Sequence, residues 1–250
     1  EAVGKIKSTI AIGPLVHALG SSSTDVRQAA ADSLVRMGTS TVPALLEAFE
    51  YGDGTVRRWA AEVLGQIGDG RAQQLLVSAL QDPDERVIRY TAVALDGLGK
   101  VSSIEHLVSL LGHPNKDIRY AAVEGMAGTG SSRAVKHIAK CLGDEDWVVR
   151  LAAVCGLGEI GSRTCVAPLI KALNDKEWSV RRHASTGLGR IGVKKGSVDA
   201  LIAALGDPKE SVRSAAAEAL GELGGKDAVQ ALRRALADED AEVVVAAQEA

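Results

Sequence analysis

The clearest pattern in the sequence is a set of apolar and basic positions that recurs every 30 to 32 residues along the chain. Its reference position, the anchor, is usually arginine; alanine follows three residues later in most copies, and leucine or methionine follows seven residues later. The anchors of copies 1 to 8 are Arg27, Arg57, Ile88, Arg119, Arg150, Arg181, Arg213 and Val244. Such regular spacing predicts a structural repeat.

Each copy contains two segments with helical periodicity. Large apolar residues lie twelve and eight positions before the anchor, as at Leu169 and Leu173, which places both on one face of a first helix, helix A. The apolar positions after the anchor form the buried stripe of a second helix, helix B. Glycine eleven positions after the anchor, as at Gly161, suits the left-handed backbone that ends many helices. The pattern therefore predicts an all-α solenoid of about eight two-helix repeats.

The turn between helices A and B has its own signature. Aspartate stands six positions before the anchor in five copies, at Asp82, Asp144, Asp175, Asp207 and Asp238. We expect these carboxylates to accept hydrogen bonds from the first N–H groups of helix B. The anchor arginines are expected to bind these aspartates or the turn carbonyls of the neighbouring copy. Both rows are therefore interpreted as contacts that hold the repeats together.

The segment from Trp147 to Gly161, Trp-Val-Val-Arg-Leu-Ala-Ala-Val-Cys-Gly-Leu-Gly-Glu-Ile-Gly, resembles the short HEAT-like repeat of the phycobilisome-lyase type. The resemblance covers essentially the entire chain and implies a right-handed α-α superhelix. Repeats of this type serve many unrelated roles, so the resemblance specifies the fold and leaves the function open.

The two ends of the chain match the repeat but not a cap. Val3 to Lys7 fit the last turns of a preceding helix B, and the chain closes at Ala250 in the middle of another. Solenoids need polar capping repeats at their ends. We therefore expect residues 1–250 to be one repeat domain, an excerpt of a longer array or a domain of a larger protein with further domains.

Composition narrows the class of protein. The chain is 46% hydrophobic and only 3% aromatic, and its formal net charge is −3. No apolar run is long enough for a membrane span, and the charge is too small to attract a polyanion or an anionic membrane. The three cysteines, at 141, 155 and 165, have no CxxC spacing and fit free thiols in a reducing compartment, which predicts a cytoplasmic location.

No catalytic, cofactor or metal site is predicted from the sequence. His106 and His137 occupy equivalent positions on adjacent A helices, which lie on the order of 10 Å apart, too far for a shared zinc ion. Cys155 has no histidine nearby in its own copy to act as a base. No His-Glu dipeptide and no nucleotide-binding glycine motif occurs. The sequence therefore predicts a protein that is not an enzyme.

The residues that interrupt the repeat are the candidate binding residues. They cluster near the start of helix B in copies 2 to 6, and they are Arg58, Trp59, Arg89, Tyr90, Tyr120, Trp147, Trp178, Arg182 and His183. Because stacked copies align equivalent positions, we expect one aromatic and basic band along the concave surface of the B helices. An acidic row beside it is expected at Asp32, Glu62, Glu124, Glu159, Glu218 and Glu222. For Trp147 and Trp178, local packing over the turn between helices A and B is an equal alternative.

These features predict a non-catalytic scaffold that binds a peptide or protein on its B-helix surface, because mixed charge suits such a partner better than a polyanion. Two alternatives stay open. A bilin lyase or bilin-handling subunit is implied by the family resemblance alone. In a nucleic-acid-binding module, Arg58, Arg86, Arg89 and Arg182 would contact phosphates.

Overall fold

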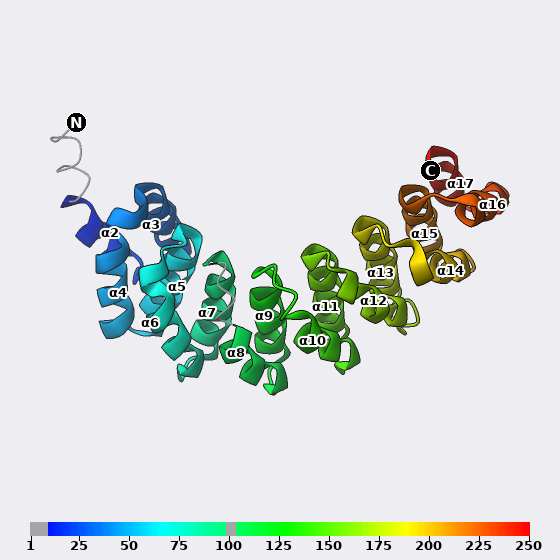
Figure 1. Ribbon diagram of the computed structural model, residues 1–250. Helices are drawn as coiled ribbons and strands as arrows, with labels where there is room; N and C mark the ends of the chain where they lie inside the picture. Colours follow the sequence, from blue (N-terminus) through cyan, green and yellow to red (C-terminus); the bar gives the residue numbers. More distant parts are fainter. Residues whose placement is uncertain (1–9, 99–103) are drawn as a thin grey trace. The chain divides into compact units, whose positions relative to one another are not determined.

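The computed structural model describes residues 10–98 and 104–250, and within these ranges the fold consists of paired helices without strands (Figure 1). The A helices are α2 (Ile12–Ala18), α4 (Val42–Tyr51), α6 (Gln73–Ser78), α8 (Ile104–Leu107), α10 (Val135–Ile138), α12 (Val166–Ala172), α14 (Lys194–Ala204) and α16 (Lys226–Ala235). The B helices are α3 (Thr24–Met37), α5 (Gly54–Ile67), α7 (Glu85–Gly97), α9 (Lys116–Ala127), α11 (Trp147–Ile160), α13 (Trp178–Ile191), α15 (Glu210–Leu223) and α17 (Ala241–Glu249). The predicted all-α repeat fold is confirmed.

Several A helices end or begin in 3₁₀ turns. The turns that continue α6, α8 and α10 are η3 (Ala79–Gln81), η5 (Val108–Gly112) and η6 (Ala139–Gly143). Those that precede α4, α6 and α12 are η1 (Gly38–Ser40), η2 (Gly70–Ala72) and η7 (Arg163–Cys165). No helix of the described residues has both the length and the apolar character that a membrane crossing requires.

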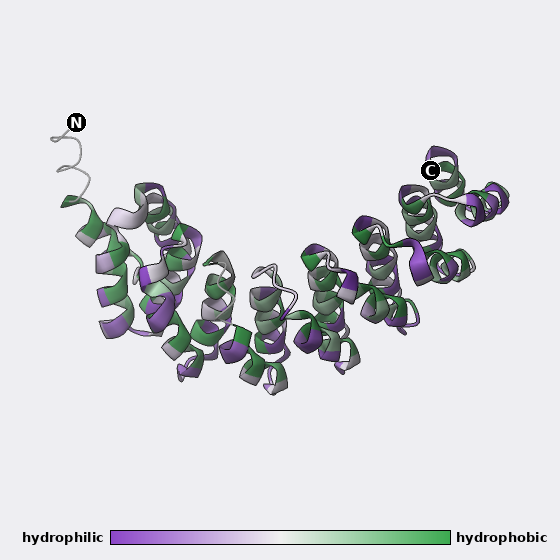
Figure 2. Cartoon of the chain, in the orientation of Figure 1, coloured by the Kyte–Doolittle hydropathy of each residue, from purple (hydrophilic) through white to green (hydrophobic). Residues whose placement is uncertain are grey.

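The chain divides into two compact units, Glu1–Thr129 and Gly130–Ala250. The boundary falls between α9 and α10, so each unit contains four of the eight copies. Within each unit the helices carry apolar and polar residues on different sides (Figure 2). The predicted helix fragment at residues 1–7 and the predicted helix-ending Gly99 lie outside the described residues.

Successive B helices pack against each other through small residues. A methyl group added at Gly65 of α5 would come within 2.5 Å of the Ala94 Cα atom on α7. In the second unit, a methyl group added at Gly158 of α11 would lie 3.4 Å from the Gly187 Cα atom on α13, which is ordinary van der Waals contact. Glycine and alanine therefore allow neighbouring B helices to approach closely.

Glycine ends the B helices at most of the expected places. Gly68, Gly161 and Gly192 adopt the left-handed conformation directly after α5, α11 and α13. Helix α9 differs, because it ends at Ala127, three residues before the expected Gly130. Gly130 still has a positive φ of 60°, so the left-handed residue lies in the following turn.

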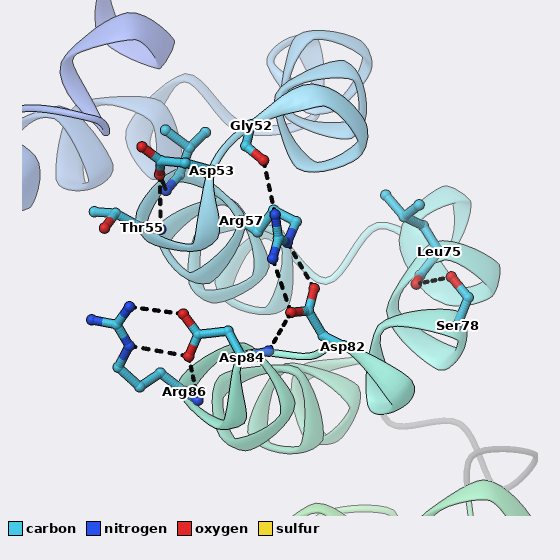
Figure 3. A network of polar contacts seen from close by, with 10 residues as sticks. Gly52, Asp53, Thr55, Arg57, Leu75, Ser78, Asp82, Asp84 and Arg86 are labelled. Atoms are coloured by element: carbon cyan, nitrogen blue, oxygen red, sulfur yellow. Dashed lines mark hydrogen bonds and ion pairs between the residues drawn. The ribbon is translucent and has the colours of Figure 1, made fainter.

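The anchor arginines join neighbouring copies, as expected, through a ladder of arginine–aspartate pairs. Arg150 donates from Nε and Nη2 to both carboxylate oxygens of Asp175 in the next copy, at 2.7 and 2.9 Å. Its Nη1 donates to the carbonyls of Asp144 and Glu145, which belong to its own turn rather than to the neighbour. Figure 3 shows the same arrangement around Arg57. Each anchor arginine of the ladder therefore fixes the turn of its own copy and binds that turn to the aspartate of the next copy.

The aspartates of the ladder do not cap helix B, which corrects the sequence-based expectation. Asp82 accepts the backbone N–H of Asp84, at 2.8 Å, before α7 begins (Figure 3). The capping side chains stand two residues later: Asp53 accepts from two N–H groups of α5, and Asp146 accepts from Val148 of α11. The reason is that helix B starts three residues before the anchor, so its cap lies four before it.

The ladder is interrupted in the first unit. Copy 3 has Ile88 as its anchor, 8% exposed, and copy 4 has His113 at the position of the ladder aspartate. These two positions are 25 residues apart, the separation that joins Arg57 to Asp82 and Arg150 to Asp175. Both residues of one arginine–aspartate pair are therefore replaced together, the arginine by Ile88 and the aspartate by His113.

Candidate partner-binding surface

In the first unit, a stack of arginines and rings crosses three neighbouring B helices. The guanidinium of Arg58, on α5, lies 4.4 Å from the Trp59 ring centroid and 4.0 Å from the Tyr90 ring centroid. Arg58 also donates from Nη2 to the Tyr90 Oη atom at 2.6 Å. Arg58 therefore lies against two rings, one from its own helix and one from α7.

Two further arginines extend this stack on both sides. Arg27, on α3, lies 5.9 Å from the Trp59 ring centroid, and Arg89, on α7, lies 4.8 Å from the Tyr90 ring centroid. The order Arg27, Trp59, Arg58, Tyr90, Arg89 defines the arginine stack. Cation–π contacts gain strength when water is excluded, so the stack also holds copies 1 to 3 together.

Trp59 is part of the core rather than of an exposed band, and the expectation for this residue is corrected. Its side chain is only 2% exposed, and its indole Nε1 atom is buried without a hydrogen-bond partner. Most copies have alanine at this position, so the larger indole fills space between helices and is covered by the guanidinium of Arg58. Trp59 therefore acts through packing and offers no surface to a partner.

Three residues of the acidic row, in copies 1, 2 and 4, pair with a residue of their own helix. Glu62 lies 3.6 Å from Arg58 on the same helix, Gln28 donates to Asp32 at 2.9 Å, and Tyr120 donates to Glu124. Each pair joins the positions one and five after the anchor, which are neighbours on a helix. The expected segregation of basic and acidic residues is thus replaced by local pairing in these copies.

The pKa of Glu62 is shifted by its position next to the arginine stack. Burial raises the pKa of its carboxyl group, while the nearby charge of Arg58 works in the opposite direction. One carboxylate oxygen is buried and has no hydrogen-bond partner. Glu62 is therefore a counter-charge for Arg58 that is poorly solvated when ionised.

In the second unit, two tryptophans of adjacent copies remain on the surface. Trp147 is 45% exposed and Trp178 is 40% exposed, and they are the first residues of α11 and α13. The ammonium of Lys209, from the next copy, lies 5.7 Å from the Trp178 ring centroid. Both indoles therefore keep a large apolar area in contact with water.

Two other candidates lie on α13 with Trp178. Arg182 is exposed. The Nδ1 atom of His183 lies 2.7 Å from the carbonyl oxygen of Ser179, which orients the half-buried ring. The expected residues therefore fall into two groups, one in each unit. Sequence reasoning did not include Lys209, although it is a lysine four positions before its anchor, where most copies have aspartate or asparagine.

The residues with catalytic or metal-binding chemistry do not gather into a site in the part of the chain that the structure describes. No group of three histidine, cysteine or carboxylate side chains there could hold a metal ion. Cys141 and Cys165 are buried, Cys155 is half-buried, and all three are free thiols. Burial raises the pKa of Cys165, which disfavours the reactive thiolate.

Solved structures of other proteins have a fold similar to that of this chain. The X-ray structure of YIBA_ECOLI is 20% identical over 95% of this chain and 90% of its own, with a TM-score of 0.69. Kap95p, solved with RanGDP, is 15% identical over 95% of this chain and 40% of its own, with a TM-score of 0.61. The CpcE–CpcF complex of phycocyanin lyase from Nostoc sp. PCC7120 is 24% identical over 88% of this chain and 91% of the matched chain, with a TM-score of 0.52. These identities show a shared fold alone.

Sequence comparison gives the family. No curated protein sequence matches this chain. The profile of HEAT repeats matches residues 12–96, 104–169 and 166–250, which together cover most of the sequence. The resemblance to HEAT-like repeats is therefore confirmed, and the chain belongs to the HEAT-repeat family.

Proposed function

We propose that this chain is a non-catalytic interaction scaffold that binds a peptide or protein partner on its B-helix surface. The observation that carries this proposal is the exposure of Trp147 and Trp178 at equivalent positions of adjacent copies. Tryptophan is the residue type most enriched among interface hot spots. Its burial by a partner gains roughly 25 cal/mol for each Å² of apolar surface removed from water.

The surroundings of the two tryptophans resemble the rim of a protein interface. Helices α11 and α13 pack against each other, so a single partner can contact both indoles. Arg182 and Lys209 add positive charge beside Trp178. Apolar anchors surrounded by charged groups are the usual arrangement in protein–protein interfaces.

Two related folds bind proteins. Kap95p is solved with RanGDP, and CpcE is solved with CpcF. These complexes support a partner-binding role for a HEAT-repeat chain, and they do not indicate which partner this chain has.

The test is capture of partners by the chain and by a variant with Trp147→Ala and Trp178→Ala. We expect the double variant to keep its helical circular dichroism, because both side chains are exposed, and to lose partners that the unchanged chain captures. Tyr51→Ala is the matched control, since Tyr51 is an exposed aromatic residue (77%) at the end of α4. Each candidate partner is then purified and its affinity for the three proteins measured directly. Equal affinity for the unchanged chain and the double variant would contradict the proposal.

A further inference from the structure

One arginine of the first unit lacks the acidic neighbour that its counterparts have. The positions one and five after the anchor form a paired row, which joins Gln28 to Asp32, Arg58 to Glu62 and Tyr120 to Glu124. On α7 the same two positions are Arg89 and Val93. Valine has no carboxylate, so the partner that Arg58 finds within its own helix is missing for Arg89.

Two acidic residues, Glu62 and Glu85, lie near Arg89, but neither forms an ion pair with it. Within the described residues Arg89 forms no ion pair, and Val93 beside it is 40% exposed. Glu62, the nearest acid on α5, feels Arg89 only through the electrostatic field. Glu85, four positions before Arg89 on α7, instead accepts a hydrogen bond from the side-chain amide of Asn115 at 2.7 Å.

Arg89 is also held in place before any ligand arrives. Its guanidinium stacks 4.8 Å from the Tyr90 ring centroid, and the Tyr90 hydroxyl is fixed by the hydrogen bond from Arg58. Stacking uses the face of a guanidinium and leaves the N–H groups on its edge available. A preorganised arginine loses less conformational entropy on binding and can hold a carboxylate through two parallel hydrogen bonds.

We propose that Arg89 binds the carboxylate of an acidic side chain in a partner peptide, and that Val93 contacts an apolar residue next to it. The ligand carboxylate takes the position that Glu62 and Glu124 have on neighbouring helices. This inference rests on the proposed scaffold function and adds to it a chemical class of partner: an extended segment in which acidic and apolar residues alternate or adjoin.

The probe is a fluorescein-labelled peptide of four Glu-Leu-Gly units, compared by anisotropy with the same peptide carrying Gln in place of Glu. We expect the unchanged chain to bind the Glu peptide roughly tenfold more tightly. Arg89→Gln removes this preference. Val93→Glu removes it as well, because it supplies the missing acid from within α7.

Arg86→Gln is the matched control. Arg86 lies on the same helix and its loss changes the charge equally, but its guanidinium is already bound to Asp84 at 2.7 and 3.1 Å. This variant keeps the preference for the Glu peptide. Equal binding of both peptides by the unchanged chain, or a preference that survives in Arg89→Gln and Val93→Glu, would overturn the proposal.

A nucleic acid is the other anionic ligand to test. A single-stranded oligonucleotide that binds more tightly than the Glu peptide, and does so only when Arg89 is present, would assign this arginine to phosphate and overturn the carboxylate proposal. The capture experiment with Trp147 and Trp178 involves neither Arg89 nor the peptide probe. Failure of one proposal is therefore distinguishable from failure of the other.

Discussion

The two units use the same repeat in different ways. In the second unit the ladder is continuous over the pairs Arg150–Asp175, Arg181–Asp207 and Arg213–Asp238. In the first unit the described ladder contains Arg57–Asp82, and copies 1 and 3 have no such pair. The first unit also has the arginine stack, and the second has exposed tryptophans. Between copies 2 and 3 the Arg57–Asp82 pair and the contact of Arg58 with Tyr90 occur together, so the stack takes the place of a ladder pair only between copies 1 and 2.

Copy 1 shows how one arrangement replaces the other. Copy 2 has Tyr51 at the position of the ladder aspartate, so the Arg27 anchor has no carboxylate to bind. Arg27 still donates to the carbonyls of its own turn, at Ser21 and Ser22, and its guanidinium lies over Trp59. An aromatic ring of the next copy thus takes the place of an acid, and the contact between copies is preserved by a cation–π interaction.

The largest expected effect separates the two kinds of tryptophan. Trp59→Ala removes a side chain that is only 2% exposed and leaves a cavity beneath Arg58, so we expect the free energy of unfolding to fall by about 3 kcal/mol. Trp147→Ala removes a side chain that is 45% exposed and is expected to cost less than about 1 kcal/mol. Urea denaturation of the full chain, followed by circular dichroism, measures both values. Similar losses for the two variants would show that burial does not distinguish these residues.

The ladder and the repeat register could be predicted from the sequence because they follow a periodic rule. The role of Trp59 could not, since its position two after the anchor holds exposed Ala29 in copy 1 and buried Ala121 in copy 4. Whether this position is covered depends on the side chains of neighbouring helices, here Arg27 and Arg58. The position in the repeat gives the helix face, and the neighbouring copies decide the exposure.

Two other differences from the sequence-based expectations, the pairing of the acidic row and the position of the helix B cap, are indicated by residue spacing. The positions one and five after the anchor differ by four, the spacing of neighbours on a helix, so pairing of Arg58 with Glu62 was available from the sequence. Polar capping residues also stand four before the anchor in several copies, as at Asp53 and Asn115. Acidic residues stand both six and four positions before the anchor. Which of them caps helix B depends on the residue at which the helix begins, and the repeat pattern does not specify that residue.

The next largest effect is expected when the missing arginine–aspartate pair is restored at positions 88 and 113. Ile88→Arg alone places a guanidinium at a nearly buried position without a carboxylate and is expected to destabilise the chain. His113→Asp supplies that carboxylate, and it keeps the turn because the new side chain can accept the Asn115 N–H that the His113 Nδ1 atom now accepts at 3.1 Å. We expect the two substitutions together to be about 2 kcal/mol more stable than the sum of their separate effects.

Ile88→Arg combined with His113→Asn is the control for this cycle, since asparagine keeps the turn and lacks the charge. Urea denaturation of the single and double variants gives the coupling free energy. Additive effects, or equal coupling with asparagine, would show that this part of the first unit has lost the geometry of the ladder and not merely its residues.

The smallest expected effect concerns one carboxylate in each unit, Asp175 and Glu62. As the pH falls, their contributions to the free energy of unfolding are expected to change in opposite directions. Although burial opposes it, the hydrogen bonds from Arg150 and from the Glu177 N–H keep the pKa of Asp175 below its usual value. Its ionised form therefore stabilises the fold above the unfolded pKa of about 3.9, and this contribution is lost as the pH falls through the lower folded pKa. Unfolding free energies of the unchanged chain and of Asp175→Asn are expected to converge in that acidic range.

Glu62 is expected to behave in the opposite way, because burial raises the pKa of its carboxyl group despite the charge of Arg58. Its ionised form is a cost to folding that is fully present above the raised pKa and disappears as the pH falls below the unfolded value of about 4.3. The unchanged chain should therefore gain stability relative to Glu62→Gln on acidification, while it loses its advantage over Asp175→Asn. Urea titrations at a series of pH values compare the three proteins. If both differences changed in the same direction, the contrast between a paired carboxylate in the ladder and a poorly solvated one beneath the arginine stack would be wrong.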